Sequence, residues 1–456
     1  MNEKDLYKSL GLSIQQCEVL GVKPLSIEKD GLRVKVNPGG EMYKTMLEYT
    51  SGMNIIFDEI NSLDSNIEQR INEEEKNIPK LIDNLLMTAI LLNGTDLHFE
   101  IYEDIFRVRI RIDGKLEVLK EIDFGMYQQV ATKIKIMADM DISEKRIPQD
   151  GRFTFHHDNR DIDIRVSTSP TIWGEKLVLR ILNGSGNILT IEDLGLSFEQ
   201  KVFMEKLTQQ SGGLVLFSGP TNSGKTTSIF ALLQLLNKED VNIITIEDPV
   251  EYRVYGLNQI QINKKSGLDF AQGLRTVLRQ DPDILMVGEI RNKETATIAL
   301  RAALTGVLVF STIHSENSIS TIFRLLDMGM EPYLIAESIL AIVSQRLVNC
   351  LCPYCKEEEV VVDPYFFNEP KNIYTERGCS KCNKGNKGRK GVFEILPFDS
   401  QIRRQIYNRA SIDKIQQLCE VKQISTLKKE FSKGLLKGEY SLKEVQKKIN
   451  TLQGIL

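Results

Sequence analysis

The segment at residues 219–226 constrains this chain more than any other, because it reads Gly-Pro-Thr-Asn-Ser-Gly-Lys-Thr and follows an apolar run at 213–217. Glycines at this spacing let successive backbone N–H groups surround a phosphate, and the helix expected at 226–236 adds the positive end of its dipole. A chance match in a glycine-rich turn is the alternative, but the strand–loop–helix context argues against it. The sequence therefore predicts a nucleoside triphosphate site.

Two side chains of this segment have a specific chemical role. Lys225 is expected to reach the β- and γ-phosphates of the nucleotide, and the Thr226 hydroxyl is expected to take a Mg²⁺ coordination position. The residues expected to contact the nucleotide are Gly219, Pro220, Thr221, Asn222, Ser223, Gly224, Lys225, Thr226 and Thr227.

The length and composition are those of a globular protein with several domains. A chain of 456 residues is expected to form about three domains. No apolar stretch approaches the ~18–20 residues needed to cross a bilayer, and residues 1–5 lack the pattern of a signal peptide. We therefore expect a cytoplasmic protein whose membrane role is peripheral. A net charge of −4 argues against a dedicated nucleic-acid binder, which would carry a strongly basic surface.

Four of the seven cysteines form two Cys-x-x-Cys pairs, Cys352/Cys355 and Cys379/Cys382, which 23 residues separate. In a reducing compartment this spacing favours a tetrahedral zinc site over disulfides. Unliganded or redox-active cysteines are the alternative. Cys350 is close enough in sequence to compete as a ligand.

Changes in composition predict four segments. A small N-terminal domain at 1–76 is followed by an α+β module at 77–183, a flexible Gly/Asn/Ser linker at 184–190 and a larger domain at 191–456. The larger domain includes the cysteine ribbon at 350–392 and a tail with a helical pattern at 401–455. In the module, strands are expected at 96–101, 106–112, 116–119, 152–155, 161–167 and 176–182, with a helix at 127–138.

In the larger domain, strand and helix patterns alternate in the way that is typical of a parallel, doubly wound α/β sheet. Strands are expected at 213–217, 242–246, 284–287 and 308–313, and helices at 226–236, 293–304 and 318–327. Ligands bind such sheets at the carboxyl ends of the strands. The chemistry of the chain is therefore expected at that edge.

Acidic residues follow two of these strands. Glu247 ends the strand 22 residues after Lys225 and is placed to hold an attacking water, although a solvated turn before Pro249 is the alternative. Glu289 follows the buried strand at 284–287 and is expected to organise the Mg²⁺ water shell. We assign Glu247 as general base and Glu289 to the metal, with the two roles open to exchange.

A histidine and several arginines complete the expected site. His314 follows the strand at 308–313, where an imidazole can sense the γ-phosphate by a hydrogen bond, although a lone histidine is more often structural. In the module, Arg109 and Arg111 alternate with apolar residues, so they leave one face of a strand, and Arg165 lies in a similar strand. Such a row is either a solvated sheet surface or an anion clamp of the arginine-finger kind.

Together these motifs resemble the secretion ATPases of the type II secretion and type IV pilus-assembly group, from about Leu81 onward. The matching segments are 94–100, 109–114, 146–152, 165–168, the phosphate-binding loop, 245–252 (similar to the family's Asp box), 287–291 (its Walker B) and 311–315 (its His box). Two positions depart from the family pattern. Asn222 stands where glycine is usual, which predicts slower turnover, and Val307 stands where a first histidine often precedes the box.

The resemblance implies a RecA-like P-loop motor domain, a preceding PAS-like domain, and a homohexamer with ATP bound between the two domains. It implies hydrolysis of ATP to drive pilin or pseudopilin assembly through an inner-membrane platform protein. The cysteine pairs are similar to those of assembly and secretion members, which favours extension over retraction. A type IV pilus, a competence pseudopilus and a type II secretion pseudopilus all remain open. No repeat of the kind that binds cyclic di-GMP is evident at the N-terminus.

Two other classes of protein compete with this interpretation. A nucleic-acid translocase or helicase could also join a RecA-like core to a zinc ribbon, but the basic cluster at 381–390 carries no aromatic residue for base stacking. A scaffold without catalysis would require a damaged site, whereas Lys225, Glu247, Glu289 and His314 are all present.

Overall fold

The computed structural model describes residues 6–7, 9–10, 17, 22–28, 31–36, 47–48, 51, 53–57, 77–92, 94–112, 114–157, 160–182, 189–263, 266–379 and 382–449. The chain divides into two compact units. The first comprises Met1–Ser185 with the short segment Gly378–Gly385, and the second comprises Gly186–Arg377 with Asn386–Leu456. The charged residues 72–76 and most of the expected linker, at 184–188, lie outside the described residues.

A small sheet begins the first unit. Its strands β1 (Val22–Glu28), β2 (Gly31–Val36) and β3 (Ile55–Phe57) are adjacent in this order, with β2 in the middle. Side chains alternate along β2, which places Leu32 and Val34 in a core with Leu10 and Cys17.

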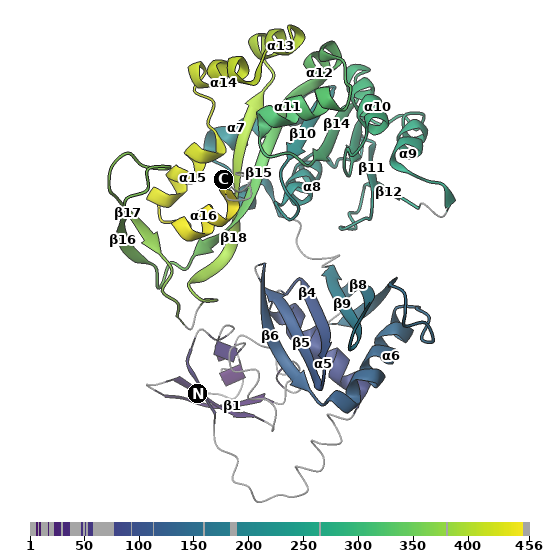
Figure 1. The fold of residues 1–456 in the computed structure, drawn as a ribbon, viewed down its shortest axis with the longest axis vertical. Coiled ribbons are helices and arrows are strands. Elements are labelled where there is room, and N and C mark those ends of the chain that lie inside the picture. The colour runs from purple at the N-terminus through teal and green to yellow at the C-terminus, as the bar shows by residue number, and fades with distance from the viewer. Residues whose placement is uncertain are drawn as a thin grey trace, which may run out of the picture. The chain divides into compact units, whose positions relative to one another are not determined.

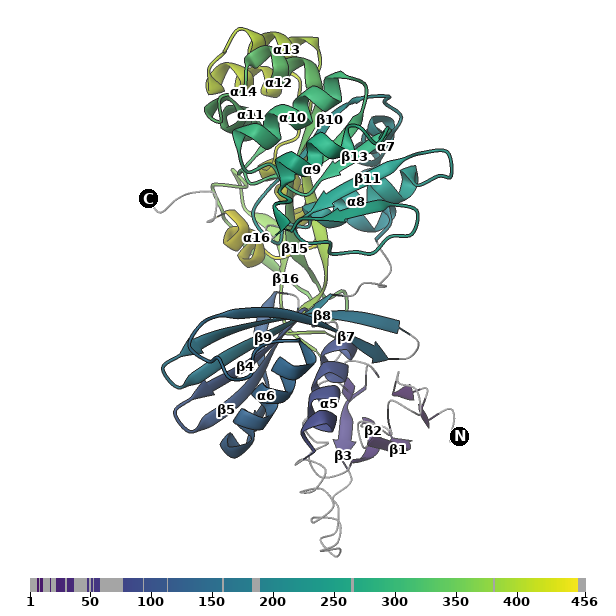
Figure 2. The same ribbon diagram turned by 90° about the vertical axis from the view of Figure 1, so that its right-hand side faces the viewer.

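A six-stranded antiparallel sheet forms the rest of the first unit, in the order β6-β5-β4-β9-β8-β7. The strands are β4 (Asp96–Tyr102), β5 (Ile105–Ile112), β6 (Lys115–Ile122), β7 (Gln149–His157), β8 (Arg160–Thr171) and β9 (Gly174–Leu182). Because side chains alternate along β4, Leu97 and Phe99 join one core with Val130 and Ile134. Helices α5 (Ile78–Leu91) and α6 (Tyr127–Met137) contribute to that core and cover one face of the sheet (Figure 2).

The second unit is built on a seven-stranded sheet in the order β12-β11-β13-β14-β10-β15-β18. The strands are β10 (Gly213–Ser218), β11 (Ile243–Glu247), β12 (Asn258–Gln261), β13 (Ile284–Val287), β14 (Leu308–Ile313), β15 (Ile339–Leu351) and β18 (Asn386–Pro397). All neighbouring pairs are parallel except β15 and β18. The predicted parallel α/β sheet is confirmed.

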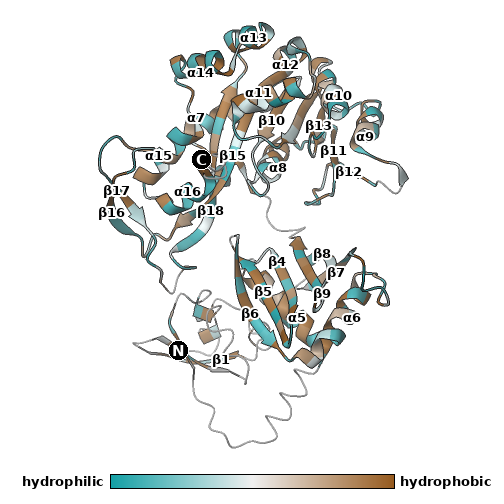
Figure 3. Ribbon diagram, in the orientation of Figure 1, coloured by the Kyte–Doolittle hydropathy of each residue, from teal (hydrophilic) through white to brown (hydrophobic). Residues whose placement is uncertain are grey.

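Helices cover both faces of this sheet (Figure 1). On one face, α7 (Phe198–Thr208) and α8 (Lys225–Leu236) pack with residues such as Val215 and Phe217. On the other face, residues such as Leu214 and Leu216 pack with α9 (Phe270–Val277), α10 (Lys293–Leu304), α11 (Ser318–Asp327) and α12 (Pro332–Ser338). Figure 3 shows hydrophobic residues along β10 and β14 and many hydrophilic ones on the outer helices.

The C-terminal part extends this sheet. Strands β15 and β18 continue beyond their neighbours, and β16 (Glu357–Val361) pairs with β17 (Lys371–Thr375) between them in the chain. The predicted helical tail consists of α13 (Ser400–Tyr407), α14 (Ile412–Val421), α15 (Leu427–Leu436) and α16 (Leu442–Ile449), with the rest of the chain outside the described residues.

Candidate functional site

The phosphate-binding loop (residues 219–224) connects β10 to α8 and has a backbone that requires its glycines. Gly219 and Gly224 have φ values of 149° and 87°. A Cβ on Gly219 would lie 2.5 Å from the carbonyl oxygen of Gln345, and a Cβ on Gly224 would lie 2.8 Å from that residue's side-chain Nε2. Asn222 has φ of 61°, a left-handed conformation that asparagine tolerates better than most residues. This explains why glycine is usual there and why asparagine fits.

The polar groups of the loop are those that a phosphate would need. The Ser223 hydroxyl is buried and has no hydrogen-bond partner among the described residues. The Lys225 ammonium donates to the carbonyl oxygens of Gly219 (2.9 Å) and Pro220 (2.8 Å). Two effects lower the pKa of Lys225 to about 8: burial, which is the larger, and repulsion from Arg346. The loop thus holds a cation and a free hydroxyl that fit an anionic ligand.

Glu247 is the last residue of β11 and is buried at the edge of the sheet. Its Oε1 accepts hydrogen bonds from Thr245 Oγ1 (2.6 Å) and Gln259 Nε2 (3.1 Å). Burial raises the pKa of Glu247 above its usual value, although these hydrogen bonds oppose the shift. A carboxylate that is fixed in orientation and has a raised pKa suits proton transfer near neutral pH.

Glu289 and His314 lie together at the same edge. Glu289 Oε2 is 3.8 Å from His314 Nε2, and the other carboxylate oxygen of Glu289 pairs with Arg291. Burial and the nearby charge of Lys225 lower the pKa of His314, so this imidazole is neutral at pH 7. The Glu289 carboxylate also attracts Lys225, which connects these residues to the loop. The sheet therefore brings Lys225, Glu289 and His314 together, as the sequence predicts.

Hydrogen bonds between strand ends fix this arrangement. The Ser311 and Thr312 hydroxyls donate to the carbonyl oxygens of Val287 (2.8 Å) and Gly288 (2.6 Å), and Ile290 N donates to Thr312 O (2.8 Å). These contacts hold the segment before Glu289 against the strand that leads to His314. A hollow of about 540 Å³ opens beside His314 and extends along α11 to Ile412.

Three further residues of the candidate site lie outside any sequence motif: Gln259, Gln345 and Arg346. Gln259 on β12 orients Glu247 and also donates to the Tyr252 carbonyl (2.7 Å). Gln345 and Arg346 lie on β15, beside the phosphate-binding loop, and Gln345 Oε1 accepts a hydrogen bond from Ser228 Oγ (2.9 Å). The signal that could have indicated β15 is the polar pair Gln345-Arg346 between two apolar runs.

The arginines of the first unit form a row across its sheet. Across the sheet, each residue of this row lies opposite the next one on the neighbouring strand. The row consists of Arg111 on β5, Asp96 on β4, Arg180 on β9, Arg165 on β8 and Arg152 on β7. Register partners point to the same face, so this row holds four arginines and one carboxylate. Such a surplus of positive charge favours anions.

Two of the predicted arginines already have carboxylate partners. Arg109 forms a bidentate pair with Glu100, at 2.6 and 2.7 Å, while Arg111 Nε lies 3.7 Å from Asp96 and its Nη1 donates to Gly114 O (2.9 Å). Burial alone would raise the pKa of Glu100. Hydrogen bonds from Arg109 and Lys176 outweigh this effect and lower the pKa of Glu100 to about 2. Arg109 is therefore firmly paired, whereas the weaker pairing of Arg111 is more easily exchanged for another anion.

The four predicted zinc ligands lie together. The Sγ atoms of Cys352, Cys355, Cys379 and Cys382 are all within 4.8 Å of one another, and this group does not include Cys350. The Cys379 and Cys382 sulfurs are 3.7 Å apart. A tetrahedral zinc with Zn–S bonds of ~2.3 Å places its sulfurs about 3.8 Å apart, so the cluster fits this metal.

A family model described as type II/IV secretion system protein matches residues 71–447. The chain belongs to this family. Type II secretion system protein E of Pseudomonas aeruginosa is 42% identical over 352 residues, covering 74% of this chain and 69% of that protein. The type IV pilus assembly ATPase PilB of Acinetobacter baylyi is 41% identical over 387 residues, covering 82% of this chain and 67% of PilB. The family resemblance found in the sequence is confirmed.

Solved structures share the fold of this type II/IV secretion family chain. The pilus retraction motor PilT with bound ADP has a TM-score of 0.57 and 26% identity, covering 80% of this chain and 96% of that structure. The Legionella pneumophila ATPase DotB has a TM-score of 0.62 and 20% identity, covering 82% of this chain and 96% of that structure. These likenesses support the α/β architecture, and the PAS-like character of the module stays a prediction.

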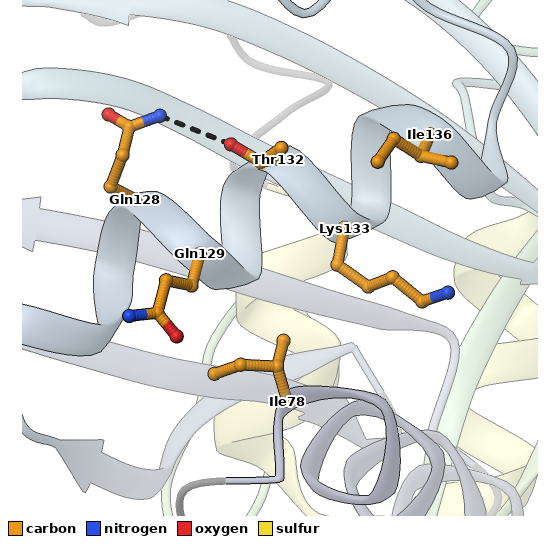
Figure 4. A pocket seen from close by; sticks show the side chains of 6 residues that line it. All are labelled: Ile78, Gln128, Gln129, Thr132, Lys133 and Ile136. Atoms are coloured by element: carbon orange, nitrogen blue, oxygen red, sulfur yellow. Dashed lines mark hydrogen bonds between the residues drawn. The ribbon is translucent and has the colours of Figure 1, made fainter.

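Two further features of this family member bear on function. A hollow of about 310 Å³ lies between α5 and α6, lined by Ile78, Gln128, Gln129, Thr132, Lys133 and Ile136 (Figure 4). It presents one charged side chain and no cluster of catalytic groups, so we do not assign chemistry to it. Within the described residues, no helix has both the length and the apolar character needed to span a bilayer.

Proposed function

We propose that this chain is a motor ATPase that hydrolyses ATP to drive pilin or pseudopilin assembly, in type IV pilus extension or type II secretion. It acts as a homohexamer at the inner face of the cell membrane, through an inner-membrane platform protein. The observation that carries the proposal is the convergence of Lys225, Glu289 and His314 at one sheet edge in a member of this family. Relatives named for both machines match at similar identity, so both remain within the proposal.

In the proposed reaction, the phosphate-binding loop holds the triphosphate of ATP. Lys225 leaves the carbonyl oxygens of Gly219 and Pro220 and binds the β- and γ-phosphates, while the Ser223 hydroxyl and the loop N–H groups contact the phosphate oxygens. Thr226 and Glu289 would hold Mg²⁺, which neutralises phosphate charge when bound.

Glu247 is the better general base of the two carboxylates. Glu289 is already paired with Arg291 and faces His314, so its charge is committed to fixed neighbours. Glu247 is held by neutral donors, and its raised pKa gives it a stronger affinity for the proton of an attacking water. His314, neutral and adjacent to Glu289, reports the γ-phosphate by a hydrogen bond.

The arginine row supplies the second half of the proposed site. Arg111 would exchange its contact with Asp96 for the γ-phosphate at the interface with another copy or domain, and Arg109 and Arg165 would support it. The surplus of arginines in the row makes this exchange favourable, because Asp96 retains Arg180 at 2.9 Å. Zinc, bound by the four cysteines, would stabilise the ribbon and not the phosphate site.

The experiment is steady-state hydrolysis of Mg-ATP by the full-length protein. Lys225→Ala should abolish turnover because the cation that binds the β- and γ-phosphates is lost. Lys206→Ala, which removes an exposed lysine of α7, is the matched control and should turn over like the parent. Turnover of Lys225→Ala at the parent rate would refute the assignment. Stimulation by single-stranded DNA and not by ring assembly would instead favour the translocase.

A further inference from the structure

Arg346 on β15 is a buried cation whose charge the fold does not balance locally. Its side chain is 2% exposed, and among the described residues it forms no ion pair with a carboxylate. Its Nη2 donates to the carbonyl oxygen of Glu316 (2.7 Å) and its Nη1 to that of Gln345 (3.1 Å). Its Nε is buried and has no hydrogen-bond partner.

This arrangement is costly unless an anion binds nearby. A guanidinium stays protonated, and a buried charge without a counter-ion destabilises the folded state. Glu316 and Glu394 attract Arg346 from a longer distance, but neither comes within ion-pair contact. A buried, incompletely paired arginine beside a phosphate-binding loop therefore indicates that phosphate charge is part of its environment.

The two hydrogen bonds of Arg346 go to the two segments that form the site. The Gln345 carbonyl lies against Gly219, where it leaves no room for a Cβ. The Gly219 backbone in turn contacts both Lys225 and His314. Glu316 follows His314 by two residues. The Arg346 guanidinium thus contacts both the Gln345 backbone, which packs against the phosphate-binding loop, and the loop that carries His314.

Resting on the ATPase function proposed above, we propose that Arg346 is a positioning residue of the reaction. It holds the His314 loop in register with the phosphate-binding loop. Its charge attracts the triphosphate without contact, whereas Lys225 contacts the phosphates directly. Arg346 does not itself touch the reacting atoms, because its side chain is enclosed.

A comparison of kcat with KM makes this role measurable. A residue that keeps the His314 loop in register with the phosphate-binding loop acts on the chemical step, so its loss should lower kcat more than it raises the KM for ATP. Loss of Lys225 should instead remove a direct contact with the phosphates.

The test compares Arg346→Met and Arg346→Lys with the parent in steady-state hydrolysis of Mg-ATP, separating kcat from KM. Arg346→Met should lower kcat by at least about tenfold, with a smaller change in KM. Arg346→Lys keeps the charge but loses the planar fork, so it should also lower kcat. Arg301→Met, which removes an exposed arginine of α10, should change neither.

The outcomes separate this inference from the proposed function. If the parent is active and Lys225→Ala is inactive, but Arg346→Met keeps the kcat of the parent, the role of Arg346 is refuted and the ATPase stands. If the parent itself hydrolyses no ATP, the proposed function fails first. Should Arg346→Met not fold, as judged by thermal unfolding, Arg346→Lys decides: a parent-like kcat refutes the role, and a loss of at least about tenfold supports it.

Discussion

At the scale of single residues, the environment of Glu247 distinguishes it from the other carboxylate of the site. It is buried, is oriented by Thr245 and Gln259, and has a raised pKa. Glu289, by contrast, is bound to Arg291 and lies beside His314. Two acids at one sheet edge can thus have different chemistry because their neighbours differ.

The first prediction separates their roles. Glu247→Gln should lower kcat by about 10²–10⁴-fold with ATP affinity close to that of the parent, because a general base acts on the water and not on the ground state. Glu289→Gln should also raise the Mg²⁺ concentration needed for half-maximal rate. The measurements are kcat, nucleotide binding and a Mg²⁺ titration. The reverse pattern would exchange the two assignments.

A second prediction follows from the pKa of Glu247. The base must be deprotonated, so kcat/KM should rise with pH through the pKa of this carboxyl, which lies above the ordinary glutamate value of about 4.5. The acidic limb of the pH profile should therefore disappear in the residual activity of Glu247→Gln. Persistence of the same limb in this variant would assign it to another group.

Sequence patterns identify site residues of this kind only in part. Lys225 lies in a local motif, and Glu247, Glu289 and His314 follow apolar runs that mark strand ends, so each could be predicted. Gln259 and Arg346 could not, because their roles depend on contacts with segments distant in sequence, such as Glu316. The pairing of Arg109 with Glu100 also appears only once β4 and β5 are in register.

At the scale of elements, one buried carboxylate connects two helices. Glu394 on β18 accepts hydrogen bonds from Ser318 N (2.9 Å) and Ser318 Oγ at the start of α11, and from Leu427 N (2.9 Å) at the start of α15. A negative charge at a helix N-terminus is favourable, and here it serves both helices. The helix that follows the His314 loop is thereby tied to the C-terminal helices.

The third prediction concerns this connection. Glu394→Ala leaves buried N–H groups unpaired at both helices, so it should lower stability by about 2–4 kcal/mol. Amide hydrogen exchange should accelerate in the first turns of α11 and α15 together. Glu420→Ala, which removes an exposed carboxylate of α14, is the control. Faster exchange in only one of the two helices would show that Glu394 does not couple them.

The fourth prediction concerns the cysteine ribbon. The purified protein should contain one zinc per chain, and Cys352→Ser with Cys355→Ser should lose it and unfold the ribbon at lower temperature, with ATP affinity near that of the parent. Cys350→Ser should keep the metal, because Cys350 is outside the four-sulfur group. Metal analysis and thermal unfolding check both statements. Absence of zinc from the purified parent protein would contradict the proposed zinc site.

Elements differ in how well their sequence predicts them. Strands β10, β13 and β14 are short apolar runs that end at glycine or polar residues, and their predicted bounds agree with the structure to within a residue. The only sequence signal for β15 is a polar pair between two apolar runs, and this signal is weak because the polar residues break the apolar run. Ser344 and Gln345 are buried there because the hydroxyls of Ser218 (2.5 Å) and Ser228 (2.9 Å) pair with their side chains.

At the scale of the whole molecule, the phosphate-binding loop and the arginine row belong to different compact units. An arginine row can act on ATP only where another unit presents a bound phosphate. In the proposed motor, this occurs between copies or domains in a ring, so that hydrolysis changes how the units associate. The row carries more arginines than carboxylates and is therefore suited to such an exchange.

Arg111→Ala should consequently lower kcat by about 10²-fold or more, with a smaller effect on nucleotide affinity, as expected for the loss of an arginine finger. Arg107→Ala is the matched control, because Arg107 lies on the same strand and pairs with the exposed Glu121 at 2.6 Å. If Arg111→Ala kept the kcat of the parent, the arginine row would be only a solvated sheet surface with no role in hydrolysis.

Mixed rings test most directly the claim that ATP hydrolysis is a joint activity of several copies. Arg111→Ala and Glu247→Gln subunits, each nearly inactive alone, are combined in varied ratios and their ATP turnover is measured. If the arginine is supplied in trans, some interfaces regain both groups, and turnover should exceed the sum of the separate variants and peak at intermediate ratios. Turnover that never exceeds that sum would contradict a shared site between copies.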